Sequence, residues 1–154
     1  MMTNALRVLN TQGISFTALD YPVDEDDLSA MAVAAKTGLE PDRIFKTLAV
    51  LGDRTGPFIC VIPGSSELDF KKVAKASGNR SVEMYPLRDL ESLTGYVRGG
   101  CSPVGLRKKL PIFFDETIQI WEEVAVSAGR RGLQMLLAPA SLISVTGGTL
   151  ADLT

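Results

Sequence analysis

Residues 45–62 read FKTLAVLGDRTGPFICVI, and this stretch decides the fold. Two apolar runs, 45–51 and 57–62, flank the polar, glycine-bounded segment Gly52-Asp53-Arg54-Thr55-Gly56. Apolar runs separated by so short a turn are typical of a β-hairpin. We therefore expect two antiparallel strands here.

Helices are predicted on both sides of this hairpin by capping residues and glycine stops. Ser, Thr and Asp side chains accept hydrogen bonds from the free N–H groups of a first turn, and glycine readily ends a helix. Shorter helices are expected near residues 87–93 and 140–145. The three capped helices run from Thr3 to Gly13, from Ser29 to Gly38 and from Asp69 to Gly78.

The remaining apolar segments are short and predict strands at irregular intervals. Because regular β-α-β alternation is absent, a doubly wound fold is disfavoured and an α+β fold with a mixed sheet is favoured. No repeat or linker divides the chain, so we expect one domain over residues 1–154. The expected strands lie at 14–21, 81–84, 96–97, 112–114, 124–127 and 133–137.

The bulk composition is that of an ordinary globular domain, with 45% hydrophobic and 22% charged residues among 154. No apolar run reaches the roughly 18 residues that a membrane span requires. The N-terminal MMTNALRVLN lacks the basic start and apolar block of a secretory signal. We therefore expect a cytoplasmic protein without a membrane partner.

The chain contains no histidine, which restricts its chemistry. Ser-His and Cys-His nucleophile pairs and most zinc sites are excluded, so neither a metal nor a cofactor is expected. Any reaction must use Lys, Asp, Glu, hydroxyls, backbone N–H groups or the substrate itself. Two cysteines, Cys60 in an apolar run and Cys101 after two glycines, do not form a disulfide framework.

Charge is distributed unevenly although the net charge is only −2. Residues 1–70 carry five Lys and Arg against ten Asp and Glu, whereas the remainder carries eleven against eight. The basic clusters of the second part can hold an RNA backbone, or they can be solvated surface charge. These clusters are Lys71-Lys72-Lys75, Arg107-Lys108-Lys109 and Arg130-Arg131.

Three segments combine glycine or lysine with polar groups and are candidates for chemistry. In 45–48, Lys46 enters an otherwise apolar strand, where a lysine needs a partner or a task unless it reaches solvent. In 95–105, paired glycines let a ligand approach backbone N–H groups, although a plain turn is the alternative. In 126–133, a strand ends in small residues and two arginines, which suits either a tight turn or an RNA-phosphate contact beside a small pocket.

The same segments carry a resemblance to a known family. FKTL (45–48), SELDFKKVAKASG (66–78), LTGYVRGGCSPVGLRKKLP (93–111) and VSAGRRGLQ (126–134) occur in the family's order and spacing. With these blocks the chain resembles the YbaK/EbsC family of Cys-tRNA(Pro) deacylases over nearly its whole length. The resemblance implies a compact α+β domain on a curved, barrel-like mixed sheet with surrounding helices. This fold is shared with the editing domain of bacterial prolyl-tRNA synthetases.

The resemblance also implies a site. Lys46 is the essential residue in this reading, and Gly100 and Ser102 complete the catalytic set. Residues 24–31 depart from the family, because they are fewer and lack an aromatic that some members place against the substrate. The implied substrate-binding residues are Tyr21, Gly99, Cys101, Pro103, Ser127, Ala128 and Gly129.

A histidine-free deacylase is chemically reasonable, because an aminoacyl ester is already activated. Lys46 would hold the carbonyl or the terminal phosphate, and the N–H of Gly100 and its neighbours would steady an oxyanion. Cys101 stands where the family commonly has an aliphatic residue, and no histidine can activate its thiol. We therefore expect no catalytic role for it.

The expected partners are the acceptor end of a misacylated tRNA and prolyl-tRNA synthetase. Three alternatives remain: a deacylase for another aminoacyl-tRNA such as Ala-tRNA(Pro), a binding module for a tRNA end or a synthetase, and a thiol redox protein. The last is disfavoured because Cys101 has no Cys-x-x-Cys partner. The residues expected to contact RNA are Lys71, Lys72, Arg107, Lys108, Lys109 and Arg131.

Overall fold

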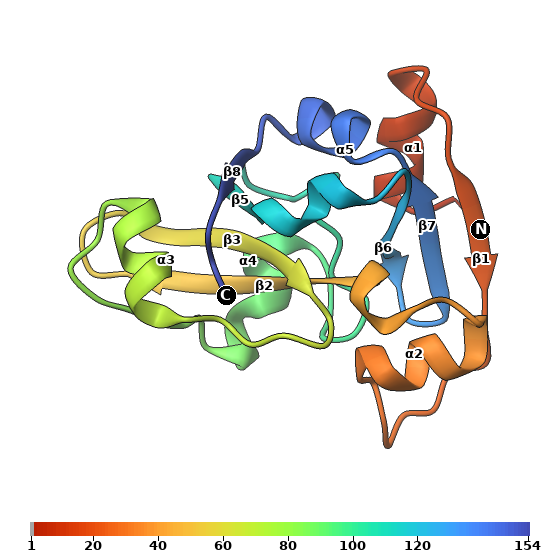
Figure 1. The fold of residues 1–154 in the computed structure, drawn as a ribbon, viewed down its shortest axis with the longest axis horizontal. Helices are drawn as coiled ribbons and strands as arrows, with labels where there is room; N and C mark the ends of the chain where they lie inside the picture. Colours follow the sequence, from red (N-terminus) through yellow and green to blue (C-terminus); the bar gives the residue numbers. More distant parts are fainter. Residues whose placement is uncertain (1) are drawn as a thin grey trace.

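The predicted hairpin forms the centre of a five-stranded mixed sheet (Figure 1). The computed structural model describes residues 2–154. Lys46 on the first hairpin strand lies opposite Ile62 on the second. Two more strands follow beside the second hairpin strand, and each of them pairs in parallel with the strand before it. The strand order is β4 (Val82–Met84), β2 (Phe45–Gly52), β3 (Gly56–Pro63), β5 (Ile112–Asp115) and β8 (Thr149–Ala151).

A separate three-stranded antiparallel sheet lies at the other end of the molecule (Figure 1). Ser127 and Gln134 are paired across its hairpin, and the next pair is Arg130 with Leu133. Ala128 and Gly129 are therefore bulged out of the ladder, which re-aims both residues. The strand order is β1 (Thr17–Asp20), β7 (Leu133–Leu137) and β6 (Val124–Arg130).

The two sheets meet at the start of β2 and then separate. A parallel bridge between Ile44 and Ala125 joins them, and β4 pairs with β2 only from Val50 onward. Within residues 2–154, no strand pairs with 46–48 on the edge that faces away from β3. This geometry forms a fork, with β2 on one side and the β6–β7 hairpin on the other.

Helix boundaries follow the predicted caps. The side chains of Thr3, Ser29 and Asp69 each accept a hydrogen bond from a first-turn N–H, and Gly38 and Gly78 end their helices with positive φ. Figure 1 shows α1 at the upper end of the three-stranded sheet, α5 beside it above the region between the two sheets, and α2 below the three-stranded sheet. The α-helices are α1 (Asn4–Thr11), α2 (Ala30–Thr37), α3 (Phe70–Ser77), α4 (Leu90–Thr94) and α5 (Pro139–Thr146), and the 3-10 turns are η1 (Pro41–Arg43), η2 (Leu87–Asp89) and η3 (Glu116–Ile120).

Apolar side chains gather in three clusters that hold these parts in place. The largest contains Leu9, Phe45 and Met135, so it joins α1, β2 and β7. A second cluster lies under α3. In the third cluster, Val33 of α2 packs with Leu136 of the three-stranded sheet. Burial of such side chains contributes on the order of 1.5–3 kcal/mol each. This largest cluster, the main core, contains residues from both sides of the fork and therefore holds the two sides in place.

Some predictions require correction. In the described range 2–154 the strands form two sheets, and neither closes into a barrel, so the α+β fold is confirmed and the single barrel-like sheet is not. The strand expected at 96–97 is absent because buried Tyr96 donates its hydroxyl to the Val104 carbonyl and so closes a loop. The strand expected at 14–21 is shorter, and β8 was not predicted.

Candidate active site

A cavity of about 610 Å³ occupies the fork between the two sheets. This volume falls within the range of small-molecule sites in proteins. The wall is discontinuous in sequence and combines both sheets with α2. It is formed by Leu28, Ser29, Ala30, Met31 and Val33, by residues 44–49, by Gly64, Ser65 and Glu67, by Met84, Tyr85, Leu87 and Leu90, by Arg98, Gly99 and Cys101, and by Ser127 and Gln134.

Lys46 is the cationic side chain that β2 contributes to this wall. Its side chain is 28% exposed, and its Nζ lies 3.6 Å from Oε1 of Glu67, whose side chain is 91% exposed. An ion pair with so exposed a carboxylate contributes little, about 0–1 kcal/mol. The Lys46 ammonium can therefore exchange Glu67 for an anionic or polar ligand at small cost.

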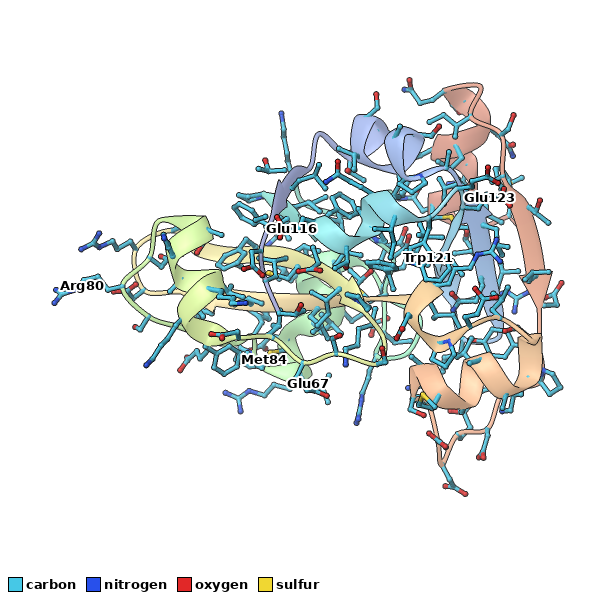
Figure 2. The ribbon with its side chains drawn as sticks, in the orientation of Figure 1. Glu67, Arg80, Met84, Glu116, Trp121 and Glu123 are labelled. Atoms are coloured by element: carbon cyan, nitrogen blue, oxygen red, sulfur yellow. The ribbon has the colours of Figure 1, made fainter. Side chains whose placement is uncertain are left out.

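The cavity has a buried inner end and an apolar rim. Cys101, Ser127 and Gln134 are 6%, 8% and 5% exposed, respectively. The rim contains the exposed side chains of Met31, Met84 and Leu87. In Figure 2, Glu67 and Met84 both lie along the lower edge of the five-stranded sheet. A ligand that entered past these methionines would reach polar groups inside.

The paired glycines form a close contact between a loop and the β6–β7 turn. Gly99 lines the cavity with φ of 81°, and a Cβ there would lie 3.1 Å from the Leu28 side chain. A Cβ on Gly100 would lie 2.9 Å from the backbone nitrogen of Arg131. The Gly100 N–H donates to the Val97 carbonyl at 3.0 Å. Contact of this N–H with an oxyanion would require that bond to be exchanged.

Other predicted residues lie behind the wall rather than in it. Ser102 is fully buried, and its hydroxyl accepts a hydrogen bond from the Val104 N–H. Pro103 is buried in the same turn. Because of the bulge, the Ala128 carbonyl accepts from the Thr3 hydroxyl, and Gly129 packs against Tyr96. These residues shape the loop and the hairpin, and they do not line the cavity.

Tyr21 also lies outside the large cavity. It contributes to a small hollow on the other side of Leu28 and Gly99, which line both spaces. The loop between β1 and α2 is held there by an ion pair between Arg131 and Glu25. Arg131 also donates from Nε to the Arg98 carbonyl at 2.8 Å.

The residues expected to contact RNA come from separate elements. Lys71 and Lys72 are in the first turn of α3, where Lys72 pairs with Asp152 at 3.2 Å. The exposed cluster Arg107-Lys108-Lys109 lies between α4 and β5. Arg131 is engaged with Glu25, as described above.

Arg98, Thr47 and Gln134 are among the wall residues that the sequence analysis did not select. Arg98 is exposed on the cavity wall and is the cation of the glycine loop. Thr47 and Gln134 line the cavity, and Gln134 is the single polar residue in the run Leu133–Leu137. A lone amide in an apolar strand is a detectable signal, because buried polar groups need partners.

Two further observations bear on the kind of site. Among residues 2–154, no group of three or more His, Cys, Asp or Glu side chains is arranged to hold a metal ion. In the same range, no helix combines the length and apolarity needed to cross a membrane.

The family model of the aminoacyl-tRNA editing domain matches residues 25–145, which include every wall segment of the cavity. The chain belongs to this family. Lys46, the glycine loop and the polar inner end therefore lie in the cavity of an editing domain. The resemblance to YbaK/EbsC proteins is confirmed by the relatives of this editing domain.

Two relatives in sequence and one in structure are informative. The Enterococcus faecalis protein named "Putative Cys-tRNA(Pro)/Cys-tRNA(Cys) deacylase EbsC" is 49% identical over 152 residues, covering 99% of this chain and 93% of that protein. A proline–tRNA ligase of Limosilactobacillus fermentum is 27% identical over 109 residues, covering 68% of this chain and 19% of the ligase. A crystal structure of "a putative trans-editing enzyme for prolyl tRNA synthetase" is 26% identical with a TM-score of 0.87, covering 98% of this chain and 94% of that one.

The Cys101 thiol of this editing domain is a poor nucleophile. Burial raises the pKa of Cys101 to about 11, so the reactive thiolate is scarce at neutral pH. We expect Cys101→Val to keep deacylation within about threefold of the unmodified protein, with any change confined to amino-acid preference. Single-turnover rates on two aminoacyl-tRNAs measure this. Complete loss of turnover in a folded Cys101→Val protein contradicts it and restores a thiol mechanism.

Proposed function

We propose that this protein is a trans-editing deacylase that hydrolyses the ester of misacylated tRNA, with Cys-tRNA(Pro) as its preferred substrate. The observation that carries the proposal is a partly buried lysine in the wall of an editing-domain cavity. The 49% identity to EbsC, whose name states Cys-tRNA(Pro) and Cys-tRNA(Cys), supports the substrate. The protein acts in the cytoplasm, where tRNA is charged.

Catalysis rests on positioning and on charge stabilisation. The fork holds the ester between β2 and the glycine loop, so that the carbonyl oxygen lies near the Lys46 ammonium. Negative charge develops on this oxygen when a nucleophile adds, and a preorganised cation lowers the barrier. The substrate assists in one of two ways. Its thiol adds to the carbonyl, gives its proton to the departing 3′-oxygen of the tRNA and leaves a thiolactone that water then hydrolyses, or a ribose hydroxyl positions the water that attacks the carbonyl and expels the 3′-oxygen. Gly100 and Ser102 act by holding the loop, since their polar groups bond within it.

The rim of the cavity suits the end of a polynucleotide. The exposed Met31, Met84 and Leu87 offer apolar contact to the terminal nucleobase, and Arg98 offers a cation to a phosphate. The amino acid then points inward toward Cys101, Ser127 and Gln134. This orientation puts the part that distinguishes one aminoacyl-tRNA from another at the buried end.

The exposed cluster Arg107-Lys108-Lys109 gives a testable RNA contact. We expect Lys108→Glu/Lys109→Glu to weaken tRNA binding and to reduce the slope of log K against log salt by roughly one unit per lost phosphate contact. Hydrolysis of a small aminoacyl-ester should change little. The matched control is Arg54→Glu/Arg80→Glu, which makes the same charge change in the β2–β3 turn and just before β4. Figure 2 shows Arg80 at the end of the five-stranded sheet that lies far from the three-stranded sheet. An unaltered slope in the first variant places the RNA elsewhere.

A panel of aminoacyl-tRNAs tests the function as a whole. Cys-tRNA(Pro), Ala-tRNA(Pro), Pro-tRNA(Pro) and Cys-tRNA(Cys) are incubated with the protein under single-turnover conditions. Fast hydrolysis of Cys-tRNA(Pro) with Pro-tRNA(Pro) spared is the expected result. Preference for Ala-tRNA(Pro) would reassign the substrate. Tight binding without turnover would make the protein a binding module.

The proposed protein partner is prolyl-tRNA synthetase. The match to part of a proline–tRNA ligase and the likeness to a trans-editing structure support this choice. Editing in trans needs access to tRNA as it leaves the synthetase. Faster deacylation on addition of prolyl-tRNA synthetase to the single-turnover assay is the expected sign of such a complex.

A further inference from the structure

Two buried oxygen atoms in the cavity wall have no hydrogen-bond partner. Thr47 Oγ1 on β2 and Gln134 Oε1 on β7 are the only buried side-chain oxygens or nitrogens in residues 2–154 left in this state. Buried polar groups are almost always hydrogen-bonded, because leaving one unpaired costs stability. Both residues line the same cavity. Both oxygens can therefore accept a hydrogen bond from a ligand in the cavity.

The two residues are held on opposite sides of the fork. Thr47 lies on the part of β2 where the two sheets separate, and the residues two positions before and after it, Phe45 and Ala49, are buried. Gln134 is paired with Ser127 on β6 and with Leu19 on β1, so its backbone is fixed on both sides. Strand pairing fixes the backbones of both residues, so the points from which the two side chains leave the cavity wall are set before a ligand binds. The gap between them is therefore a preformed polar position.

We propose that Thr47 and Gln134 bind the α-amino group of the aminoacyl ester and select for a free amine. This inference rests on the proposed function for the identity of the ligand. The amide oxygen of Gln134 can only accept a hydrogen bond, and the threonine hydroxyl can accept one as well. The matching ligand group carries at least two N–H or O–H donors directed at two walls. An α-amino group has them.

Other donors of the ligand fit this position less well. Gln134 is at the buried end of the cavity, whereas the ribose hydroxyls and the nucleobase belong nearer the exposed methionines of the rim. The cysteine thiol is a single weak donor. The inner end also has no carboxylate, because the only acidic residue in the described wall is the exposed Glu67. Neutral acceptors therefore bind the amine.

Two probes that resist hydrolysis test this selection directly. In both, the 3′-oxygen of adenosine is replaced by an amide nitrogen; one carries a cysteinyl group and the other a 3-mercaptopropionyl group. They differ only in the α-amino group. We expect the wild-type protein to bind the cysteinyl probe about tenfold or more tightly in calorimetry, and Gln134→Met or Thr47→Val to remove that preference.

Stability separates a ligand contact from a structural role. Because neither oxygen is bonded in the free protein, Gln134→Met and Thr47→Val should leave Tm unchanged or raise it. The matched control is Thr146→Val on α5, whose hydroxyl donates to the Leu142 carbonyl at 2.9 Å. This variant should lower Tm and keep the preference for the cysteinyl probe.

Equal binding of the two probes by the wild-type protein overturns the inference, and so does a preference that survives in both variants. A loss of affinity for both probes alike in the variants also overturns it, because the contact would then be to another group. Failure of the proposed function shows separately, as absence of tRNA hydrolysis. A wild-type protein that prefers the amine through Gln134 without deacylating tRNA supports the inference and makes the cavity a binding site.

Discussion

Lys46→Ala is expected to slow single-turnover deacylation of Cys-tRNA(Pro) about a hundredfold to a thousandfold. This corresponds to about 2.7–4 kcal/mol, the loss typical of removing one preorganised donor from a developing oxyanion. The lysine enters the cavity from the strand edge, and its pairing with exposed Glu67 leaves it available to a ligand. Lys46→Arg should also fail, because a planar guanidinium does not replace a compact ammonium.

The fold should survive both changes at Lys46. The side chain is partly exposed, and the ion pair lost with it contributes about 0–1 kcal/mol. Circular dichroism and Tm check this. Lys75→Ala, on the exposed side of α3, is the matched control and should keep full activity. Near-normal turnover by folded Lys46→Ala protein would remove Lys46 from the mechanism.

Gly100→Ala is expected to lower the same rate about a hundredfold and to destabilise the fold. The added methyl group would lie 2.9 Å from the Arg131 nitrogen and 3.0 Å from the Arg130 Cα, and backbone atoms cannot move aside as a side chain can. Overpacking of this kind costs about 1–3 kcal/mol. The loop must shift, and with it the wall at Gly99 and Cys101. A displacement of about 1 Å in a site can cost a hundredfold in rate.

Gly147→Ala separates the two effects of the Gly100 change. Gly147 ends α5 with φ of 66° and has open space around its Cα, so alanine there is strained by about 1–2 kcal/mol without steric overlap. The residue is not part of the cavity wall. Thermal unfolding should show similar losses for the two variants, whereas only Gly100→Ala should lose turnover. Equal rates would show that the loop position does not matter to catalysis.

The parts of the fold that depend on neighbours in sequence were predictable. Ser29 and Gly38 bound α2 as expected, because a cap needs only the residues of its own turn. The β2–β3 hairpin followed from its turn in the same way. The bridge between Ile44 and Ala125 was not predictable, since it joins residues about half the chain apart.

The candidate site, like the fold, was predictable from the sequence only in part. The family resemblance selected Lys46, Gly99, Cys101 and Ser127, which the fork brings to one cavity. It also selected Tyr21, which lies beyond Leu28 in a separate hollow, because a motif does not say which side of a loop a residue occupies. Thr47 stands out only once its lack of a hydrogen-bond partner is seen in three dimensions, whereas Gln134 could have been found as the lone amide of an apolar strand.

The construction of the fork has a consequence for how preference among amino acids can evolve. The wall facing the ligand is divided between two sheets that meet at one bridge, and besides the main core that they share, each sheet has packing partners of its own. A substitution on β7 or α2 can reshape the inner pocket while β2 continues to present its lysine unchanged. New substrate preferences can therefore arise by single amino-acid replacements on one sheet, with the hydrolytic machinery inherited intact on the other.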